Sequence, residues 1–322
     1  MPPPPRKKKR KKRKSFLGRL FRFVLLLFLV VLIYGGYVIY EAYQASKSSY
    51  YELERGGKSA LRDDTVNIAD DPVSILILGV EDYAAKGELG RTDTIMLVTL
   101  NPFSKSMKML SIPRDTRLEF AGIDREDKIN HAHVYGGTEM VIDTVEKFLD
   151  VPIDYFIKIN FEGFIDIIDE IGGITVDVPF DFSEETTKKG EKVHFKKGPM
   201  HLMGEEALAY ARMRKQDPRG DFGRNDRQKQ VVKASIDQAL TMTTLFKVDK
   251  IAEHLGGNIQ TNLKPTEILA LQQKYASFDT SLIDYLSLEG ADHYENRVYY
   301  FIPDEASVDS LKIRLRVHLG LD

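Results

Sequence analysis

Residues 73–80 of this 322-residue chain have the sequence VSILILGV, an almost unbroken apolar run. A run of this kind is typical of a strand that is buried on both faces of an α/β sheet. Residues 95–100 (IMLVTL) and 105–112 (KSMKMLSI) predict two more strands, and the NPFS segment at 101–104 predicts a tight turn between them. We expect these three strands to form the centre of the fold.

Helices and strands alternate through the rest of the chain without a repeat, which predicts one α/β domain over residues 72–322. A pair of glycines at 136–137 opens a predicted helix at 139–149. Further helices are predicted at 161–170, 205–210, 226–245 and 304–319, with two more in the region between the last two. The other predicted strands are 155–159, 174–178 and 298–302.

The amino-terminal 40 residues differ in composition from the rest. Eleven basic residues precede the first acidic residue, Glu41, and residues 23–40 (FVLLLFLVVLIYGGYVIY) carry no charge. With Leu20 and Phe21, this run is long enough to span a bilayer as a helix. Because basic segments stay on the cytoplasmic side, we predict a single-pass type II protein of the cell membrane. Its parts would be a cytoplasmic basic stem (1–19), a transmembrane helix (20–40), an extracellular linker (41–71) and an extracellular catalytic domain (72–322).

Two other interpretations of the amino terminus explain less. A cleaved signal peptide has a shorter apolar core and small residues at its cleavage site, which this run lacks. A nucleic-acid-binding tract would explain residues 2–14, but not the apolar run that follows them. From Glu41 onward the 48 acidic residues exceed the 35 basic ones, so nucleic acid is not an expected partner. The absence of cysteine excludes disulfides, thiolate metal sites and a cysteine nucleophile.

Charged residues gather where the predicted strands end, which is where open α/β sheets form their ligand sites. Glu81 follows the first strand, GRTDT at 90–94 leads into the second, and PRDT at 113–116 follows the third. Glu81 and Asp93 are expected on neighbouring loops. One or two carboxylates together with substrate phosphates form a typical Mg²⁺ site.

The segment from Arg212 to Arg227 contains five arginines and one lysine. The guanidinium group binds phosphate oxygens in a bidentate manner and keeps its charge. Arg212 and Arg214 are expected to point the same way from an extended segment. Arg224, Arg227 and Gln228 would share one face of a helix. The alternative is a solvated network of ion pairs, because aspartates alternate with these arginines.

Other candidate residues are weaker. His131 and His133 are spaced to hold a metal, but no third His or Cys lies nearby in the sequence, so we expect loop residues. Thr92 and Ser111 have no recognisable activating histidine, and no G-x-S-x-G motif occurs. Neither a Walker loop nor a G-x-G-x-x-G motif occurs, so nucleotide binding has no support.

Eight segments, in order and spacing, resemble the LytR–CpsA–Psr family. They are LILGVED, GRTDT, NPFSKSMKMLSIPRDT, DKINHAHVYGG, NFEGF, DEIGGITVDV, GEEALAYARMRKQ and GDFGRNDRQ, between residues 72 and 240. Members are cell-envelope proteins that transfer glycopolymers from a polyprenyl pyrophosphate carrier to peptidoglycan. The resemblance implies a single α-β-α sandwich with a central mixed sheet, a hydrophobic pocket for the polyprenyl tail and an arginine-lined mouth for the pyrophosphate.

The resemblance also implies the residues of the site. The pyrophosphate-binding residues would be Arg91, Arg114, Arg212, Arg214, Arg224, Arg227 and Gln228. Mg²⁺ would be held by Asp93 together with Glu81 or Asp82, because the family usually has aspartate at the position where this chain has Glu81 followed by Asp82.

The implied activity is a Mg²⁺-assisted ligation of the phosphotransferase type. A peptidoglycan hydroxyl would attack the phosphorus that bears the polymer, here expected to be wall teichoic acid, and polyprenyl phosphate would leave. Asp93, fixed by Arg114, is the first choice for the general base, although the same carboxylate is predicted to hold the metal. Membrane lipid would be a further partner, and the sequence does not fix the oligomeric state. Two alternatives are a non-catalytic envelope regulator or anion sensor, and a polyprenyl pyrophosphate hydrolase.

Overall fold

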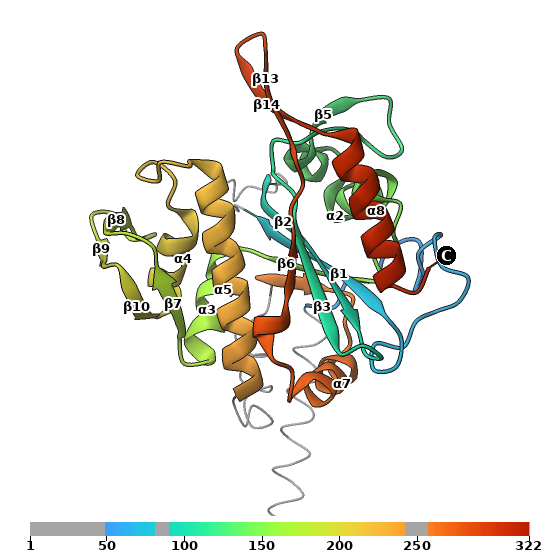
Figure 1. The fold of residues 1–322 in the computed structure, drawn as a ribbon, viewed down its shortest axis with the longest axis horizontal. Coiled ribbons are helices and arrows are strands. Elements are labelled where there is room, and N and C mark those ends of the chain that lie inside the picture. The colour runs from blue at the N-terminus through green and yellow to red at the C-terminus, as the bar shows by residue number, and fades with distance from the viewer. Residues whose placement is uncertain (1–48, 81–89, 242–256, 322) are drawn as a thin grey trace, which may run out of the picture.

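The structure is a computed structural model that describes residues 49–80, 90–241 and 257–321. Its centre is a six-stranded mixed sheet in the order β11-β6-β1-β2-β3-β12 (Figure 1). The strands are β1 (Val73–Val80), β2 (Thr92–Asn101), β3 (Ser106–Ser111), β6 (Tyr155–Ile159), β11 (Ile259–Thr261) and β12 (Asp284–Leu286). β1 runs parallel to β6 and antiparallel to β2, while β3 runs antiparallel to β2 and parallel to β12. The three strands predicted first are confirmed as the centre of this sheet.

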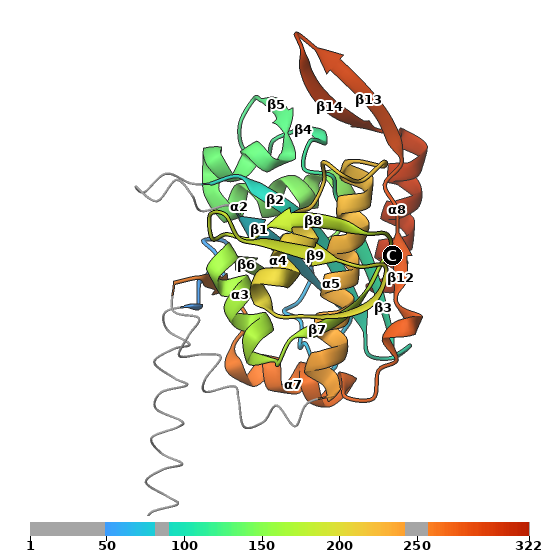
Figure 2. The same cartoon turned by 90° about the vertical axis from the view of Figure 1, so that its left-hand side faces the viewer.

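Helices cover both faces of the sheet, which explains the continuous apolar sequence of β1 (Figures 1 and 2). Leu76 and Leu78 pack on one face with α2 (Ile129–Leu149) and α8 (Glu305–His318). Ile75 and Met96 pack on the other face, toward α5 (Asp221–Thr241) and α7 (Pro265–Tyr275). The predicted α/β class and the mixed sheet are therefore confirmed.

A third core lies beside α5. It joins α3 (Phe161–Glu170) and α4 (Gly204–Arg212) to two small sheets, which pair β7 (Ile174–Val178) with β10 (Gly198–Leu202) and β8 (Phe182–Glu185) with β9 (Lys192–Phe195). Strands β8 to β10 were not predicted, because charged residues interrupt β8 and β9, and β10 begins with Gly and Pro. One buried aromatic each holds β8 and β9 to this core, and the rings of Phe182 and Phe195 stack 4.6 Å apart.

The helix predicted at 139–149 is the second part of a longer element. α2 begins at Ile129 and kinks at Gly136 and Gly137, where Gly137 has φ 64°, a value that favours glycine. The glycine pair has non-helical backbone angles and separates two helical parts, so the helix predicted at 139–149 is confirmed as the second part of α2. His131 and His133 lie on the first part of α2, and their prediction as loop residues is wrong.

The second half of the predicted linker packs against the domain. Leu53 and Ile68 are buried, and the Arg62 guanidinium lies 2.6 Å from the carboxylate of Asp154. Tyr50 also forms a β-bridge with Thr261 of β11. The packed domain thus begins well before residue 72, and the polar sequence around these two apolar anchors concealed it.

Several predictions fall outside the described residues. They are the basic stem, the transmembrane helix at 20–40, and the loop that carries Glu81 and Asp82. Within residues 49–80, 90–241 and 257–321, no helix has the length and apolar character needed to cross a membrane.

A hairpin of β13 (Gly290–Glu295) and β14 (Val298–Pro303) projects beyond the rest of the fold in both views (Figures 1 and 2). Every residue of β13 is exposed. Arg117, in the short β4 (Arg117–Glu119) that pairs with β5 (Glu126–Lys128), supports the hairpin. Its Nη1 lies 2.7 Å from Glu295 Oε2, and its guanidinium lies 5.2 Å from the centre of the Tyr300 ring.

His318 at the end of α8 connects this helix to the sheet. Its Nδ1 lies 2.8 Å from Thr99 Oγ1, and its Nε2 lies 2.8 Å from Ser106 Oγ. Burial, and secondarily the charge of Lys108, lower the pKa of His318 from 6.5 to about 4. The folded protein therefore keeps this ring neutral at pH values where the unfolded chain protonates it.

Acid is expected to weaken the fold through His318. The contribution of the neutral ring is complete above pH 6.5 and is lost as the pH falls toward about 4, because only the unfolded chain binds the proton in this window. Between neutral pH and about pH 4.5, the wild-type chain should lose about 1–3 kcal/mol more unfolding free energy than His318→Asn. The measurement is urea unfolding of the full-length chain in detergent. His293→Asn, on the exposed β13, should follow the wild type, and parallel curves for wild type and His318→Asn would contradict the prediction.

Candidate active site

An apolar cavity of about 180 Å³ lies between the sheet and helices α3, α4 and α5. Its apolar lining consists of Ile77, Ile159, Phe161, Phe164, Leu208, Ala211, Val231 and Val232. Five side chains with charged or amide groups also line it, namely Asp93, Asn160, Arg212, Arg224 and Gln228. The cavity therefore suits a ligand that has a hydrocarbon part and an anionic part.

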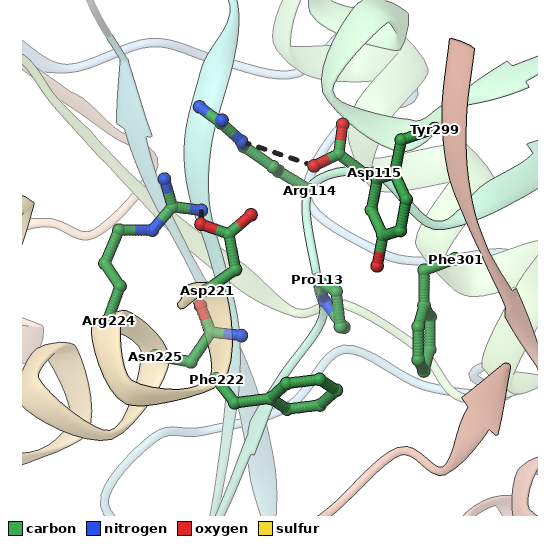
Figure 3. Close-up of a pocket in the computed structure, with 9 residues that line it drawn as sticks. All are labelled: Pro113, Arg114, Asp115, Asp221, Phe222, Arg224, Asn225, Tyr299 and Phe301. Carbon is green, nitrogen blue, oxygen red and sulfur yellow. Dashed lines mark ion pairs between the residues drawn. The ribbon is translucent and has the colours of Figure 1, made fainter. Parts of the chain in front are cut away.

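A second, smaller pocket of about 20 Å³ lies at the base of the β13–β14 hairpin, and we call it the hairpin pocket (Figure 3). It is lined by Pro113, Arg114 and Asp115 after β3, by Asp221, Phe222, Arg224 and Asn225 at the start of α5, and by Tyr299 and Phe301 of β14. Arg224 lines both spaces, so the apolar cavity and the hairpin pocket meet at its side chain.

Arg114 is held by carboxylates on two sides. Its Nη1 donates a hydrogen bond of 2.6 Å to Asp93 Oδ1, and its Nε lies 3.5 Å from Asp115 Oδ2. Burial alone would lower the pKa of Arg114, but the hydrogen bond and charge of Asp93 outweigh it and raise the pKa. The geometry fixes the guanidinium group toward the strand end where Asp93 lies.

Arg224 is a buried cation that carboxylates compensate only in part. Its side chain is only 9% exposed, and its Nη2 lies 3.4 Å from Asp221 Oδ1. The same oxygen lies 3.7 Å from Nη1 of Arg214. Burial and the neighbouring charge of Arg114 lower the pKa of Arg224. Because arginine still keeps its proton at neutral pH, the site holds a desolvated positive charge that an anion would stabilise.

The hydrogen bonds of Arg224 also indicate a binding site for an anion. Among the described residues, the buried Nε of Arg224 has no hydrogen-bond acceptor. A buried donor without an acceptor is costly, and a phosphate oxygen in the cavity would supply one. An anionic ligand in the cavity would therefore complete the hydrogen bonding of Arg224.

The structure brings five predicted site residues together: Asp93, Arg114, Arg212, Arg224 and Gln228. Arg212 does not lie in an extended segment as predicted, because it is the last residue of α4. Its guanidinium lies 4.7 Å from the centre of the Phe161 ring, over the wall of the cavity. Arg214 is exposed beside Asp221, and Arg91 is exposed and lines neither space.

Arg227 does not belong to the site, and its prediction as a pyrophosphate-binding residue is wrong. Its side chain is 1% exposed and forms an ion pair with the equally buried Asp217. Its other donors bond to the main-chain oxygens of Tyr210 and Met213. The helix-face argument failed because α5 has the apolar cavity on one side and the α4–α5 connection on the other.

This ion pair positions the first turn of α5. Burial would raise the pKa of Asp217, but hydrogen bonds from Arg227 and from the main-chain nitrogen of Arg219 outweigh it and lower the pKa. Gly223 packs directly against the pair, because a Cβ at this position would lie 1.8 Å from Asp217 Oδ2. The close approach allows the next residue, Arg224, to face the cavity.

The hairpin pocket contains residues that the sequence analysis did not assign. Asp115 and Asp221 stand next to predicted residues, and their place within PRDT and GDFGR was an available signal. Tyr299 and Phe301 are more than 70 residues further along the chain, outside the segments that carried the resemblance. No local sequence signal connects Tyr299 and Phe301 to the arginines. These residues come together only because β14 packs beside β4 in the fold.

The predicted metal ligands are tested only in part. Asp93 lines the cavity, and its Oδ1 accepts from Arg114, while Glu81 and Asp82 lie outside the described residues. The described part of the chain contains no group of three or more His, Asp and Glu side chains arranged to hold a metal. A single carboxylate still fits Mg²⁺, because this ion is often held by one or two carboxylates plus substrate phosphates.

Guanidinium groups at the mouth of an apolar cavity, on a mixed sheet with helices on both faces, form a site with the chemistry to suit an amphiphile with an anionic head group. The chain belongs to the LytR–CpsA–Psr family, whose model (LytR_cpsA_psr family) matches residues 36–317. The match extends well beyond residue 240, where the resemblance of the sequence motifs ended.

Similar proteins carry more specific names. The chain is 50% identical over 311 residues to the polyisoprenyl-teichoic acid–peptidoglycan teichoic acid transferase TagV of Bacillus subtilis, covering 95% of this chain and 80% of that one. The crystal structure of B. subtilis TagV matches with TM-score 0.72 and 51% identity over 79% of this chain and 99% of the other. The structure of TagT bound to LIIa-WTA matches with TM-score 0.72 and 33% identity over 84% of this chain and 100% of that one.

Replacing Arg227 should affect folding rather than ligand binding. Arg227→Met removes the main counterion of the buried Asp217 carboxylate, and we expect it to lower the free energy of unfolding by about 3–5 kcal/mol. Lys215→Ala, which removes an exposed cation from the same segment, should cost less than about 1 kcal/mol. Urea unfolding measures both. A stable Arg227→Met protein that has lost affinity for a polyprenyl pyrophosphate would instead return Arg227 to the site.

Proposed function

We propose that this protein transfers an anionic glycopolymer, wall teichoic acid, from a polyprenyl pyrophosphate carrier to peptidoglycan and so forms a phosphodiester link. The observation that carries the proposal is the desolvated Arg224, which stands between an apolar cavity and a second guanidinium group. The names of the similar transferases support the same donor and acceptor.

The donor would occupy the apolar cavity. Its polyprenyl chain would pack against the aliphatic and aromatic lining, which removes apolar surface from water. Its pyrophosphate would lie at the polar end, within reach of Arg212, Arg224 and Gln228. Arg114 would complete this set from the strand side, where Asp93 fixes its orientation. The same pyrophosphate would supply the acceptor that Arg224 Nε lacks.

The reaction would be an in-line displacement at phosphorus. A peptidoglycan hydroxyl oxygen forms a bond to the phosphorus that carries the polymer, and the bond from this phosphorus to the bridging oxygen breaks. Polyprenyl phosphate leaves with the electron pair, and the proton of the hydroxyl passes to a general base. The arginines would neutralise charge on the equatorial and leaving oxygens, which is the main task of the protein in such reactions.

Asp93 has two proposed roles, one as general base and one as metal ligand. As general base, fixed by Arg114, it would take the proton of the attacking hydroxyl. As a metal ligand, it would hold Mg²⁺ with Glu81 or Asp82. When bound, the ion would supply positive charge at the phosphate oxygens.

We also propose that residues 20–40 anchor the protein in the cell membrane, with residues 1–19 in the cytoplasm and the domain outside. The anchor would bring the cavity close to the lipid that it binds. External protease added to intact cells without their wall should digest the domain and leave residues 1–19 protected. Protection of the domain would contradict this orientation.

Arginine variants test the chemistry. In a transfer assay with purified lipid-linked donor and peptidoglycan acceptor, Arg224→Ala and Arg114→Ala should each lower turnover by about 10²- to 10³-fold, because each removes stabilisation of the transition-state charge. Arg314→Ala, on the far helix α8, should act as wild type. Near-normal turnover in both site variants would refute the proposal, and release of polymer phosphate without an acceptor would indicate a hydrolase.

Asp93→Asn separates the two roles of this residue. If the carboxylate is the base, turnover should fall while the Mg²⁺ concentration for half-maximal activity stays unchanged. If it holds the metal, that concentration should rise by about tenfold or more. Wild-type values of both quantities would remove Asp93 from the site.

A further inference from the structure

The β13–β14 hairpin carries a row of aromatic side chains on one face. In its antiparallel register, Tyr294 pairs with Tyr299 and Asp292 pairs with Phe301. Directly paired side chains share a face, as do Tyr299 and Phe301, which are two residues apart. The rings of Tyr294 and Tyr299 lie 5.4 Å apart, so Phe301, Tyr299 and Tyr294 form one continuous row.

This row runs from the interior of the protein into solvent. Phe301 is 2% exposed at the base of the hairpin, whereas Tyr294 is 69% exposed near its tip. Tyr299 Oη donates a hydrogen bond of 2.8 Å to Asp292 Oδ1, which fixes the ring between the two. Packing of the core explains Phe301 but not the exposed Tyr294.

The inner end of the row is a wall of the hairpin pocket. Figure 3 shows the rings of Tyr299 and Phe301 on one side of this pocket, with Phe222 on the side of α5. Phe222 is 55% exposed although it lies beside the charged residues of the site. Aromatic surface therefore borders the pocket on two sides, and the carboxylates of Asp115 and Asp221 also line it.

The reaction geometry gives this pocket a role. In a displacement at phosphorus, the attacking and leaving oxygens lie roughly in line on opposite sides. Polyprenyl phosphate would leave toward the apolar cavity, so the attacking hydroxyl should approach from the other side of the arginines. The hairpin pocket lies there, because Arg224 borders both spaces.

We propose that the hairpin pocket and the aromatic row of β13–β14 bind the acceptor, a glycan strand of peptidoglycan. The proposal rests on the transferase function proposed above. Sugar rings present flat C–H surfaces that stack on aromatic side chains, and their hydroxyl groups donate hydrogen bonds to carboxylates such as Asp115 and Asp221. The row is long enough to hold sugars next to the one that reacts.

Charge favours the acceptor over the donor polymer as the occupant. Residues 289–304 contain four acidic side chains (Glu289, Asp292, Glu295 and Asp304) and one basic side chain, Arg297. Two further cations lie against the hairpin, because Arg117 pairs with Glu295 and the Nζ of Lys128 lies 5.9 Å from the centre of the Tyr299 ring. A small excess of acidic groups remains, and such a surface would not attract the repeated phosphates of a teichoic acid chain. The uncharged sugar backbone of a glycan strand would not be repelled.

Sedimentation of the full-length protein in detergent with insoluble peptidoglycan, stripped of teichoic acid, tests the proposal. Tyr294→Ala should weaken binding by about five- to tenfold, and Tyr299→Ala by at least as much. Affinity for a polyprenyl pyrophosphate should stay unchanged in both variants. Because Tyr294 is largely exposed, its replacement should not disturb folding, and Tyr294→Phe should restore binding.

His293→Ala is the matched control, since His293 is the exposed neighbour on the opposite face of β13, and it should bind as wild type. Wild-type binding by both Tyr294→Ala and Tyr299→Ala would overturn the proposal. So would a selective loss of binding to purified teichoic acid. The assay needs neither donor nor turnover, so a protein that binds glycan through these tyrosines but transfers nothing would refute the proposed function and leave the glycan site standing.

Discussion

The positive charge of Arg224 is held away from water beside a second guanidinium group, and this arrangement requires negative charge from elsewhere. Asp221 supplies part of it at 3.4 Å, and Asp93 neutralises Arg114 rather than Arg224. The part of the Arg224 charge that Asp221 does not compensate faces a cavity with a mostly apolar lining. An amphiphilic phosphate ester satisfies both conditions together, since its head group compensates the charge and its chain fills the apolar space. The layers of helix and sheet around the site hold this unbalanced charge in place.

Arg224 and Arg227, three residues apart on α5, have different roles. Arg227 is fully buried, and its guanidinium donors already bond to Asp217 and two main-chain oxygens, so they are not available to a ligand. Arg224 is nearly as buried but retains an unused donor. The compensated residue fixes the start of the helix, and the uncompensated one faces the cavity. A rigid first turn keeps Arg224 from turning toward solvent, where its charge would be stabilised by water instead of a substrate.

The centre of the fold could be predicted because its signals are local. Runs of apolar residues predict β1, β2 and β3, and α3 was predicted with its observed bounds. Asp93, Arg114, Arg212, Arg224 and Gln228 also converge as predicted. Arg227 was misassigned because a helix face says which residues point together but not what lies opposite them. The aromatic row of the hairpin could not be found from the sequence. Its residues lie far along the chain from the arginines, and only the tertiary fold brings β14 to the site.

The anchoring of Tyr50 to Thr261 of β11 sets the reach of the whole domain. With residues 20–40 in the bilayer as proposed, roughly nine residues connect the lipid surface to the first fixed point of the fold, which is at most about 30 Å of fully extended chain. So short a connection would hold the domain close to the outer surface of the membrane. Polymer would then be attached only to peptidoglycan that lies within this distance of the bilayer.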